Sequence, residues 1–258
     1  MLVVGIDAGS RAIKGVLLDP GTLDVVATAQ ADQGVRQAEL ASGVVDALLR
    51  KCGRQREEVG YVVATGYGRN LVDCATTTVT EITCHARGVH RLVPGVRTVI
   101  EIGGQDSKVV RLEADGNVRD FSMNDRCAAG TGRFLEVVAS RLGVQLSDLG
   151  RLASASRSPA AISSTCVVFA ETEIVGLLAS GASPEDIVAG VQKSICSRVA
   201  GMAGRNLNPP VVFTGGVALV PGMREALQAL LGHPVTTAPD PQLTGALGAA
   251  LIAARRLA

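Results

Sequence analysis

The feature that most constrains the fold is a strand–turn–strand pattern that occurs twice. LVVGIDAGSRAIKGVLLD, residues 2–19, and TVIEIGGQDSKVVRLE, residues 98–113, share one order of features: a buried strand, a glycine-containing turn with an aspartate, and a returning strand. We align the two stretches as a weak internal repeat. Strands mixed with helices, in a pattern that occurs twice, predict an α/β protein with two similar halves.

Other segments extend this pattern. Apolar runs that end in turns predict strands in VVATAQA, VGYVVATGYG, VRDFSM and VVFTGGVAL. Apolar residues at helical spacing predict helices from Arg36 to Lys51, from about Gly130 to Leu142 and from Leu243 to Arg256. Gly53 is a plausible stop for the first of these helices, and Ser183-Pro184 predicts the start of another. We expect the chain to cross between the halves around residues 80–98 and again near the C-terminus.

Composition excludes several classes of function. Aromatic residues make up only 2% of the 258 residues and the net charge is +1, which argues against a stacking platform for single strands and against a dedicated DNA or membrane-surface binder. No run reaches the roughly 18 apolar residues of a spanning helix, and MLVVGIDAGS lacks the basic region of a signal peptide. We therefore expect a soluble cytoplasmic protein whose six cysteines are reduced.

The glycine turns are candidate phosphate-binding sites, because a turn without Cβ atoms lets backbone N–H groups approach an anion. The first turn supplies Asp7, a candidate for hydrated Mg²⁺, with Ser10 and Lys14 as candidate phosphate contacts. We expect the second turn, 103–106, to present its residues in the same geometry, and Thr214 to Gly216 form a third small turn. There is no GxxxxGK[ST] and no Rossmann GxGxxG. Each turn alone is most often a simple hairpin, so the prediction depends on their combination.

These turns resemble those of the superfamily of acetate and sugar kinases, heat-shock chaperones and actin. The resemblance implies two ribonuclease-H-like halves of an actin-like ATPase fold, at residues 1–90 and 91–240, with a terminal helix at 241–258 packing back between them. ATP or ADP would lie in the cleft. The resemblance assigns catalytic roles to Asp7, Gln105 and Asp106, and nucleotide contacts to Gly9, Ser10, Lys14, Gly103, Gly104, Gly215, Gly216 and Gln242.

Two isolated cysteines form a second feature. Cys127 in NDRCAAGTGRF and Cys166 in SSTCVVFAETE each precede a predicted helix, 39 residues apart and without a CxxC partner. A thiolate is favoured at the positive end of a helix dipole, and Ser163 or Ser164 could cap the second helix. From spacing alone, however, a lone cysteine is usually an inert small hydrophobe.

The stretches EIGGQDSK, NDRCAAGTGRFLE, STCVVFAETEI and TGGVALVPGM resemble the ATP-dependent activators of 2-hydroxyacyl-CoA dehydratases, and the ATPase subunits of benzoyl-CoA reductases are close relatives. The resemblance covers essentially the whole chain. It implies a homodimer that shares one [4Fe–4S] cluster, with Cys127 and Cys166 of each copy as ligands. It also implies Mg²⁺, a ferredoxin or flavodoxin as electron donor, and a dehydratase or reductase component as partner.

The sequence leaves open several alternatives for individual residues and for the function. Gly130, Thr131 and Gly132 form either a nucleotide-contacting turn or only the entrance to a helix. Cys52, Cys74, Cys84 and Cys196 match no motif, and adjacent Cys84 and His85 point about 100° apart on a helix, which disfavours a metal pair. A small-molecule kinase of the amino-sugar type and a nucleotide-switched assembly module are the alternative functions.

Overall fold

The computed structural model, which describes residues 1–163, 166–204 and 207–257, contains two five-stranded sheets with the same topology. The first sheet has the order β3-β2-β1-β4-β5 and the second has the order β8-β7-β6-β9-β10. In each sheet three antiparallel strands are followed by two parallel ones. The prediction of two similar α/β halves is therefore confirmed. The strands are β1 (Leu2–Ala8), β2 (Ala12–Leu18), β3 (Val25–Asp32), β4 (Val59–Thr65), β5 (Thr77–Thr78), β6 (Thr98–Ile102), β7 (Ser107–Leu112), β8 (Val118–Asn124), β9 (Val211–Thr214) and β10 (Val235–Thr237).

The first sheet is covered on both faces, which explains why β1 is apolar along its whole length. Helix α1 (Gln37–Cys52) packs against β2 and β3, and α8 (Thr244–Leu257) packs against β1 and β4. Helix α1 buries Ala41, Val44, Val45, Leu48 and Leu49 and ends at Gly53, which has the left-handed φ of 65° that favours glycine there. The predicted helices at 36–51 and 243–256 are confirmed within one residue.

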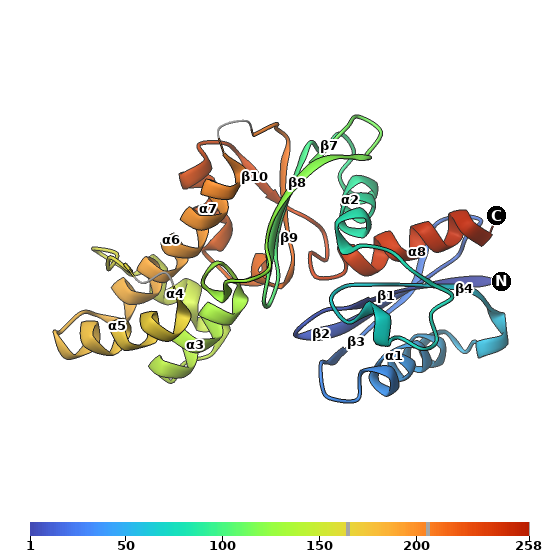
Figure 1. Ribbon diagram of the computed structural model, residues 1–258, viewed down its shortest axis with the longest axis horizontal. Helices are drawn as coiled ribbons and strands as arrows, with labels where there is room; N and C mark the ends of the chain where they lie inside the picture. Colours follow the sequence, from blue (N-terminus) through green and yellow to red (C-terminus); the bar gives the residue numbers. More distant parts are fainter. Residues whose placement is uncertain (164–165, 205–206, 258) are drawn as a thin grey trace.

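Helix α2 (Glu81–Leu92) joins the two halves, because it packs against the second sheet on one side and against α8 on the other. The two helices touch through their backbones. A Cβ at Gly88 would overlap the carbonyl oxygen of Thr244, and a Cβ at Gly248 would overlap that of Cys84. Figure 1 shows this helix pair between the two sheets. The domain boundaries at residues 90 and 240 stay a prediction.

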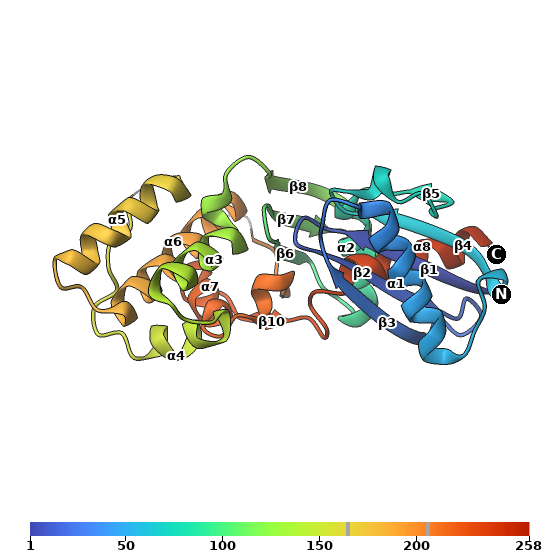
Figure 2. The same cartoon turned by 90° about the horizontal axis from the view of Figure 1, so that it is seen from below.

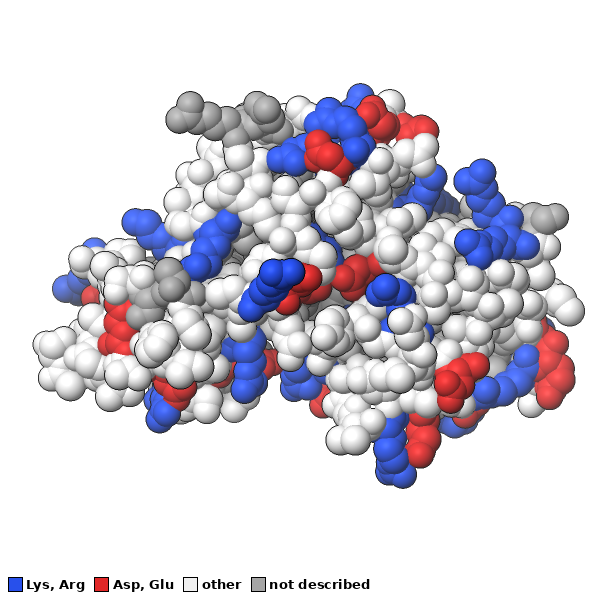
Figure 3. Space-filling model, in the orientation of Figure 1, with Lys and Arg blue, Asp and Glu red and all other residues white. Residues whose placement is uncertain are grey.

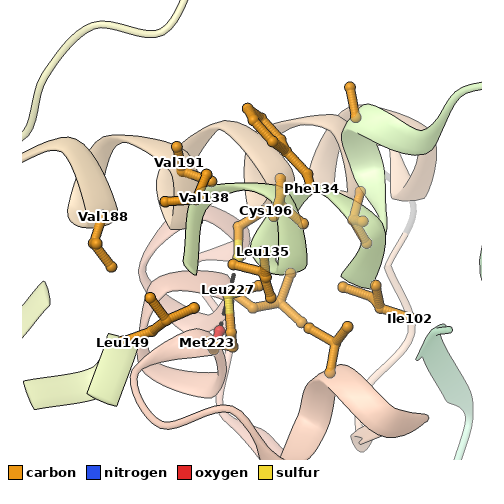
Figure 4. Packing of buried hydrophobic residues seen from close by; sticks show 14 of the residues in the cluster. Ile102, Phe134, Leu135, Val138, Leu149, Val188, Val191, Cys196, Met223 and Leu227 are labelled. Atoms are coloured by element: carbon orange, nitrogen blue, oxygen red, sulfur yellow. Dashed lines mark hydrogen bonds between the residues drawn. The ribbon is translucent and has the colours of Figure 1, made fainter. Parts of the chain in front are cut away.

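The described part of the second half contains five further α-helices: α3 (Gly132–Leu142), α4 (Leu149–Ser154), α5 (Val167–Ala179), α6 (Pro184–Ala203) and α7 (Met223–Leu231). Its core packs Phe134, Leu135 and Val138 of α3 against Val188, Val191 and Cys196 of α6, with Leu149, Met223, Leu227 and Ile102 (Figure 4). The cap predicted at Ser183 is confirmed, because its Oγ accepts a hydrogen bond from the Asp186 N–H at 3.1 Å. Helix α5 lies at the end of the molecule away from the first half (Figure 2).

In the part of the chain that the structure describes, no helix combines the length and the apolar character needed to cross a membrane.

Candidate functional site

A cavity of about 750 Å³ lies between the halves, lined by both hairpin turns, the first two turns of α2, the start of α3 and the loop after β9. Charged side chains gather on the molecular surface where the two halves meet (Figure 3). The predicted residues that line this cavity are Asp7, Gly9, Ser10, Lys14, Gly103, Gly104, Gln105, Asp106, Gly132, Gly215, Gly216 and Gln242. The fold thus brings together residues from positions 7 to 242 of the chain.

The first hairpin presents one part-buried ion pair. Asp7 at the end of β1 faces Lys14 of β2 in register, and Lys14 Nζ donates to Asp7 Oδ2 at 2.9 Å. Burial alone would raise the pKa of Asp7, but the Lys14 charge and hydrogen bond contribute to a net lowering. Asp7 is therefore an ionised carboxylate at the cleft.

The second hairpin repeats this pair with a different acid. Lys108 of β7 faces Glu101 of β6 in the register that Lys14 and Asp7 share, and the Nζ to Oε2 distance is 2.8 Å. The counterpart of Asp7 is thus Glu101, and the expectation that the second turn holds its aspartate in the same geometry is wrong. Asp106 follows the turn instead of preceding it, and its Oδ2 accepts from Lys108 at 2.8 Å. The sequence signal was an acid seven residues before a lysine in each hairpin.

Lys108 is a buried cation of the cleft that lies close to three carboxyl groups. Its side chain is 2% exposed and also lies 3.7 Å from Oε1 of Glu81 on α2. Burial alone would lower the pKa of Lys108, but Glu101, Asp106 and Glu81 raise it, so the lysine stays charged. Burial raises the pKa of Asp106 and of Glu81. Three carboxyl groups surround one lysine, so carboxyl groups outnumber cations here. Carboxylate oxygen atoms are ligands that fit a hydrated Mg²⁺.

The tips of the two hairpins touch across the cleft. A Cβ at Gly104 would lie 3.1 Å from both Ser10 Oγ and Arg11 Cβ. Arg11 also reaches the second half, where its Nε donates to Oε1 of Glu136 on α3 at 3.1 Å. Any movement of one half against the other therefore changes contacts at the two turns.

Helix α3 is attached to the second turn by its first two residues. Gly132 N–H donates to the Gly103 carbonyl at 2.8 Å, and Arg133 N–H donates to the Gly104 carbonyl at 2.9 Å. Gly130 and Thr131, predicted as nucleotide contacts, are buried and are not among the cavity-lining residues. Of the predicted GTG turn, only Gly132 lines the cleft, and the roles of all three residues stay predictions.

The loop after β9 closes the cleft on the side of α8. Gly215 has φ +90° and its N–H donates to the Pro241 carbonyl at 3.0 Å. A Cβ at Gly215 would overlap Ile102, so the glycine lets this loop lie directly against the end of β6. The neighbouring Gln242 lines the cavity as predicted from sequence.

Two cleft residues on α2 were not predicted. Glu81 and His85 are one helical turn apart, and both line the cavity. Burial lowers the pKa of His85 to about 4, so the ring is neutral. Cys84 lies in a different environment, a hydrophobic cluster with residues of α8, where burial raises its pKa to about 12. The i, i+4 spacing of Glu81 and His85 was the available signal.

The two candidate cluster ligands lie outside the cleft lining, in the second half. Both thiols are half-buried: Cys127 immediately precedes the 3₁₀ turn η3 (Ala128–Gly130), and Cys166 immediately precedes α5. Asn124 holds the Cys127 backbone with two hydrogen bonds, at 2.8 and 3.1 Å. Ser163 bonds to Glu173 instead of capping α5, and Ser164 lies outside the described residues. Helix α3 packs against both η3 and α5.

Three of the remaining thiols, those of Cys74, Cys84 and Cys196, are less suited to bind iron. Burial raises the pKa of Cys196 to about 12 and also raises that of Cys74, so these groups resist forming the thiolate that ligates a cluster. Within residues 1–163, 166–204 and 207–257, the structure holds no group of three or more His, Cys, Asp or Glu side chains arranged for a metal ion. Two half-buried thiols per chain fit a cluster only if a second copy completes the set.

Several known proteins are similar to this chain over nearly its whole length. The activator of lactoyl-CoA dehydratase from Anaerotignum propionicum is 45% identical over 254 residues, which are 98% of this chain and 97% of that protein. The (R)-2-hydroxyglutaryl-CoA dehydratase activating ATPase of Acidaminococcus fermentans is 44% identical over 257 residues, covering 99% and 98% of the two chains. The solved activator of the 2-hydroxyisocaproyl-CoA dehydratase from Clostridium difficile, with bound ADPNP, superimposes with a TM-score of 0.93 at 43% identity, covering 100% of this chain and 96% of that one.

A family model matches nearly the whole chain, residues 4–253. The chain belongs to the BadF/BadG/BcrA/BcrD ATPase family.

Proposed function

We propose that this chain is an ATP-driven one-electron donor that activates a 2-hydroxyacyl-CoA dehydratase or an aromatic acyl-CoA reductase, and that it acts in the cytoplasm. The family and the activators at about 44% identity support the ATPase and the partner class. A [4Fe–4S] cluster held by Cys127 and Cys166 of two copies would supply the one-electron chemistry, with a reduced ferredoxin or flavodoxin as its source.

One observation carries this proposal: helix α3 connects the second glycine turn to the segments that carry both thiols. Its first residues bond to the second turn, and it directly follows η3, which begins after Cys127. It also packs against α5, with an ion pair between Arg141 and Glu171. A change at the nucleotide phosphates can therefore move the segments that carry Cys127 and Cys166.

The residues of the cleft have separate roles in this proposal. Ser10 and the glycine turns contact the phosphates, Gly215, Gly216 and Gln242 contact the nucleoside, and Asp7, Glu101 and Asp106 orient hydrated Mg²⁺ and water. ATP can drive electron transfer only by binding the transfer-competent conformation more tightly than the resting one. The candidate for that change is closure of the two halves around the phosphates. Arg11 of the first half and Glu136 of the second half already form a hydrogen bond across the cleft.

The test is anaerobic purification of the full chain, with iron and sulfide assays and a visible spectrum recorded with and without ATP. We expect about four iron and four sulfide ions per two chains. Cys127→Ser and Cys166→Ser should lose the iron and keep ATP binding, because neither residue lines the cleft. Cys52→Ser is the matched control. Cys52 is also half-buried, but within the described part of the chain it hydrogen-bonds only to carbonyl oxygens of its own helix. Full iron content in the Cys127→Ser and Cys166→Ser proteins would contradict the proposal.

A further inference from the structure

His85 is joined to the start of α8 and the end of β9 by buried side-chain hydrogen bonds. Its Nδ1 lies 2.9 Å from Thr244 Oγ1, which lies 2.8 Å from Thr214 Oγ1. Thr214 Oγ1 lies 2.6 Å from the carbonyl oxygen of Pro241. A carbonyl oxygen can only accept, so Thr214 donates its single hydroxyl proton to Pro241.

The direction of this chain of bonds fixes the tautomer of His85. Thr214 has no second proton, so Thr244 is the donor, either to Thr214 or to the same Pro241 carbonyl, which lies 3.3 Å from Thr244 Oγ1. In both cases the Thr244 proton is directed away from His85. The Thr244 oxygen then accepts from Nδ1 of His85, which must carry the proton of the neutral ring. Nε2 of His85 is therefore a bare hydrogen-bond acceptor.

Nε2 borders the same small space as the carboxylate of Asp7. A Cβ at Gly245 would lie 3.1 Å from Asp7 Oδ2 and 3.2 Å from His85 Nε2, so the glycine leaves this space open. Both side chains line the cleft and are at least nine-tenths buried, at 5% and 6% exposure. Lys14 donates to Asp7 Oδ2, whereas no hydrogen bond to Nε2 is formed within the described residues.

Two adjacent acceptors at the base of a phosphate cleft require a ligand that brings protons. Mg²⁺ usually keeps several of its waters in protein sites, and a metal-bound water is a strong double donor. The geometry points to His85 as a positioning residue whose Nε2 accepts a hydrogen bond from a water of the nucleotide-bound Mg²⁺, beside the Asp7 carboxylate. This inference rests on the proposed ATPase site and adds to it a residue that the sequence patterns did not single out.

The test uses two substitutions that each keep one half of the imidazole. The amide of His85→Asn occupies the region of Nδ1 and can still donate to Thr244, but it leaves Nε2 without a replacement. The amide of His85→Gln reaches the region of Nε2 and restores an acceptor there. The measurement is Mn²⁺ binding to the full chain by electron paramagnetic resonance at saturating ADP, with ADP binding without metal measured separately.

We expect His85→Asn to weaken Mn²⁺ binding about tenfold to hundredfold, the range for loss of an outer-shell partner. His85→Gln should remain within about threefold of the native protein, because it restores the acceptor. Equal Mn²⁺ affinities of the native protein and His85→Asn, or a greater loss in His85→Gln than in His85→Asn, would overturn the inference, since a purely structural role depends on the Thr244 bond.

A second variant keeps the inference testable if His85→Asn does not fold. Thr244→Val removes the acceptor for Nδ1–H, so the tautomer is no longer fixed. We expect a change in the ¹⁵N shifts of His85 and Mn²⁺ binding weakened about tenfold; unchanged shifts and affinity would overturn the inference. Failure of the native chain to bind ADP would instead contradict the proposed function, so the two failures are distinguishable.

Discussion

The two hairpins at the cleft share one strand pairing but differ in how many carboxyl groups surround the lysine. In both, an acid at the end of one strand pairs in register with a lysine on the next, Asp7 with Lys14 and Glu101 with Lys108. Lys14 is 17% exposed and, among the described residues, forms an ion pair with Asp7 alone, whereas Lys108 is 2% exposed and also contacts Asp106 and Glu81. We infer that the first hairpin is a balanced pair open to ligand and the second is a buried network.

The largest expected difference is in stability. Lys108→Met keeps most of the side-chain volume but leaves buried carboxyl groups without their cation, so we expect a loss of about 3–5 kcal/mol in the free energy of unfolding. Lys14→Met should cost less, about 1–3 kcal/mol, because Asp7 faces the cleft. Urea unfolding followed by circular dichroism measures both. Equal losses of unfolding free energy in the two variants would mean that the additional carboxyl groups around Lys108 do not make the second hairpin energetically different from the first.

The second difference concerns hydrolysis. If Glu101 is the functional counterpart of Asp7, Asp7→Asn and Glu101→Gln should each lower the kcat of ATP hydrolysis about hundredfold. Asp106→Asn should lower it less than about tenfold, because Asp106 follows the turn and is held by Lys108. Steady-state phosphate release decides the order. A larger effect of Asp106→Asn than of Glu101→Gln would restore Asp106 as the counterpart of Asp7.

The third difference is in the sign of the pH dependence. The folded-state pKa of Asp7 is lowered, so its contribution to stability is present above its ordinary pKa of about 4 and is lost as pH falls through the folded-state pKa. The folded-state pKa of Asp106 is raised by burial, so stability falls as pH rises from about 4 through the folded-state pKa.

This opposition is tested by unfolding experiments from about pH 3 to pH 7 on Asp7→Asn and Asp106→Asn. The stability advantage of the native protein over Asp7→Asn should increase with pH. The stability of the native protein relative to Asp106→Asn should decrease as pH rises, by about 1.4 kcal/mol for each unit of pKa shift. Parallel curves for the two variants would contradict the assignment.

The smallest effect is expected at the bridge between the hairpins. Arg11 of the first turn bonds to Glu136, but its side chain is 61% exposed, so the pair contributes at most about 1 kcal/mol. Arg11→Ala should raise the Kd for ADP about twofold to fivefold at low salt, with the effect lost at high salt. Arg133→Ala is the matched control, because Arg133 bonds to Glu136 within α3. Equal effects of the two substitutions would show that bridging the halves is unimportant.

Local patterns predicted the elements that depend on local chemistry. The helix ending at Gly53 and the cap at Ser183 were readable because their signals lie within a few residues. The spacing of Glu81 and His85 indicated only that they share a face of a helix. Their place in the cleft could not be read, because it depends on contacts far along the chain: His85 meets Thr244 across 159 positions. The alignment of Asp7 with Asp106 was wrong because it compared turn residues, whereas the strand register pairs each lysine with the acid seven residues before it.

The proposed electron transfer depends most on a redox centre shared between two copies of this chain. Native mass spectrometry of the anaerobic protein tests this directly, with Cys166→Ser and Cys52→Ser measured in parallel. We predict a dimer that carries one cluster of about four iron and four sulfide ions, absent from Cys166→Ser and retained by Cys52→Ser. A complete cluster on a single chain, or an unchanged cluster in Cys166→Ser, would contradict the account.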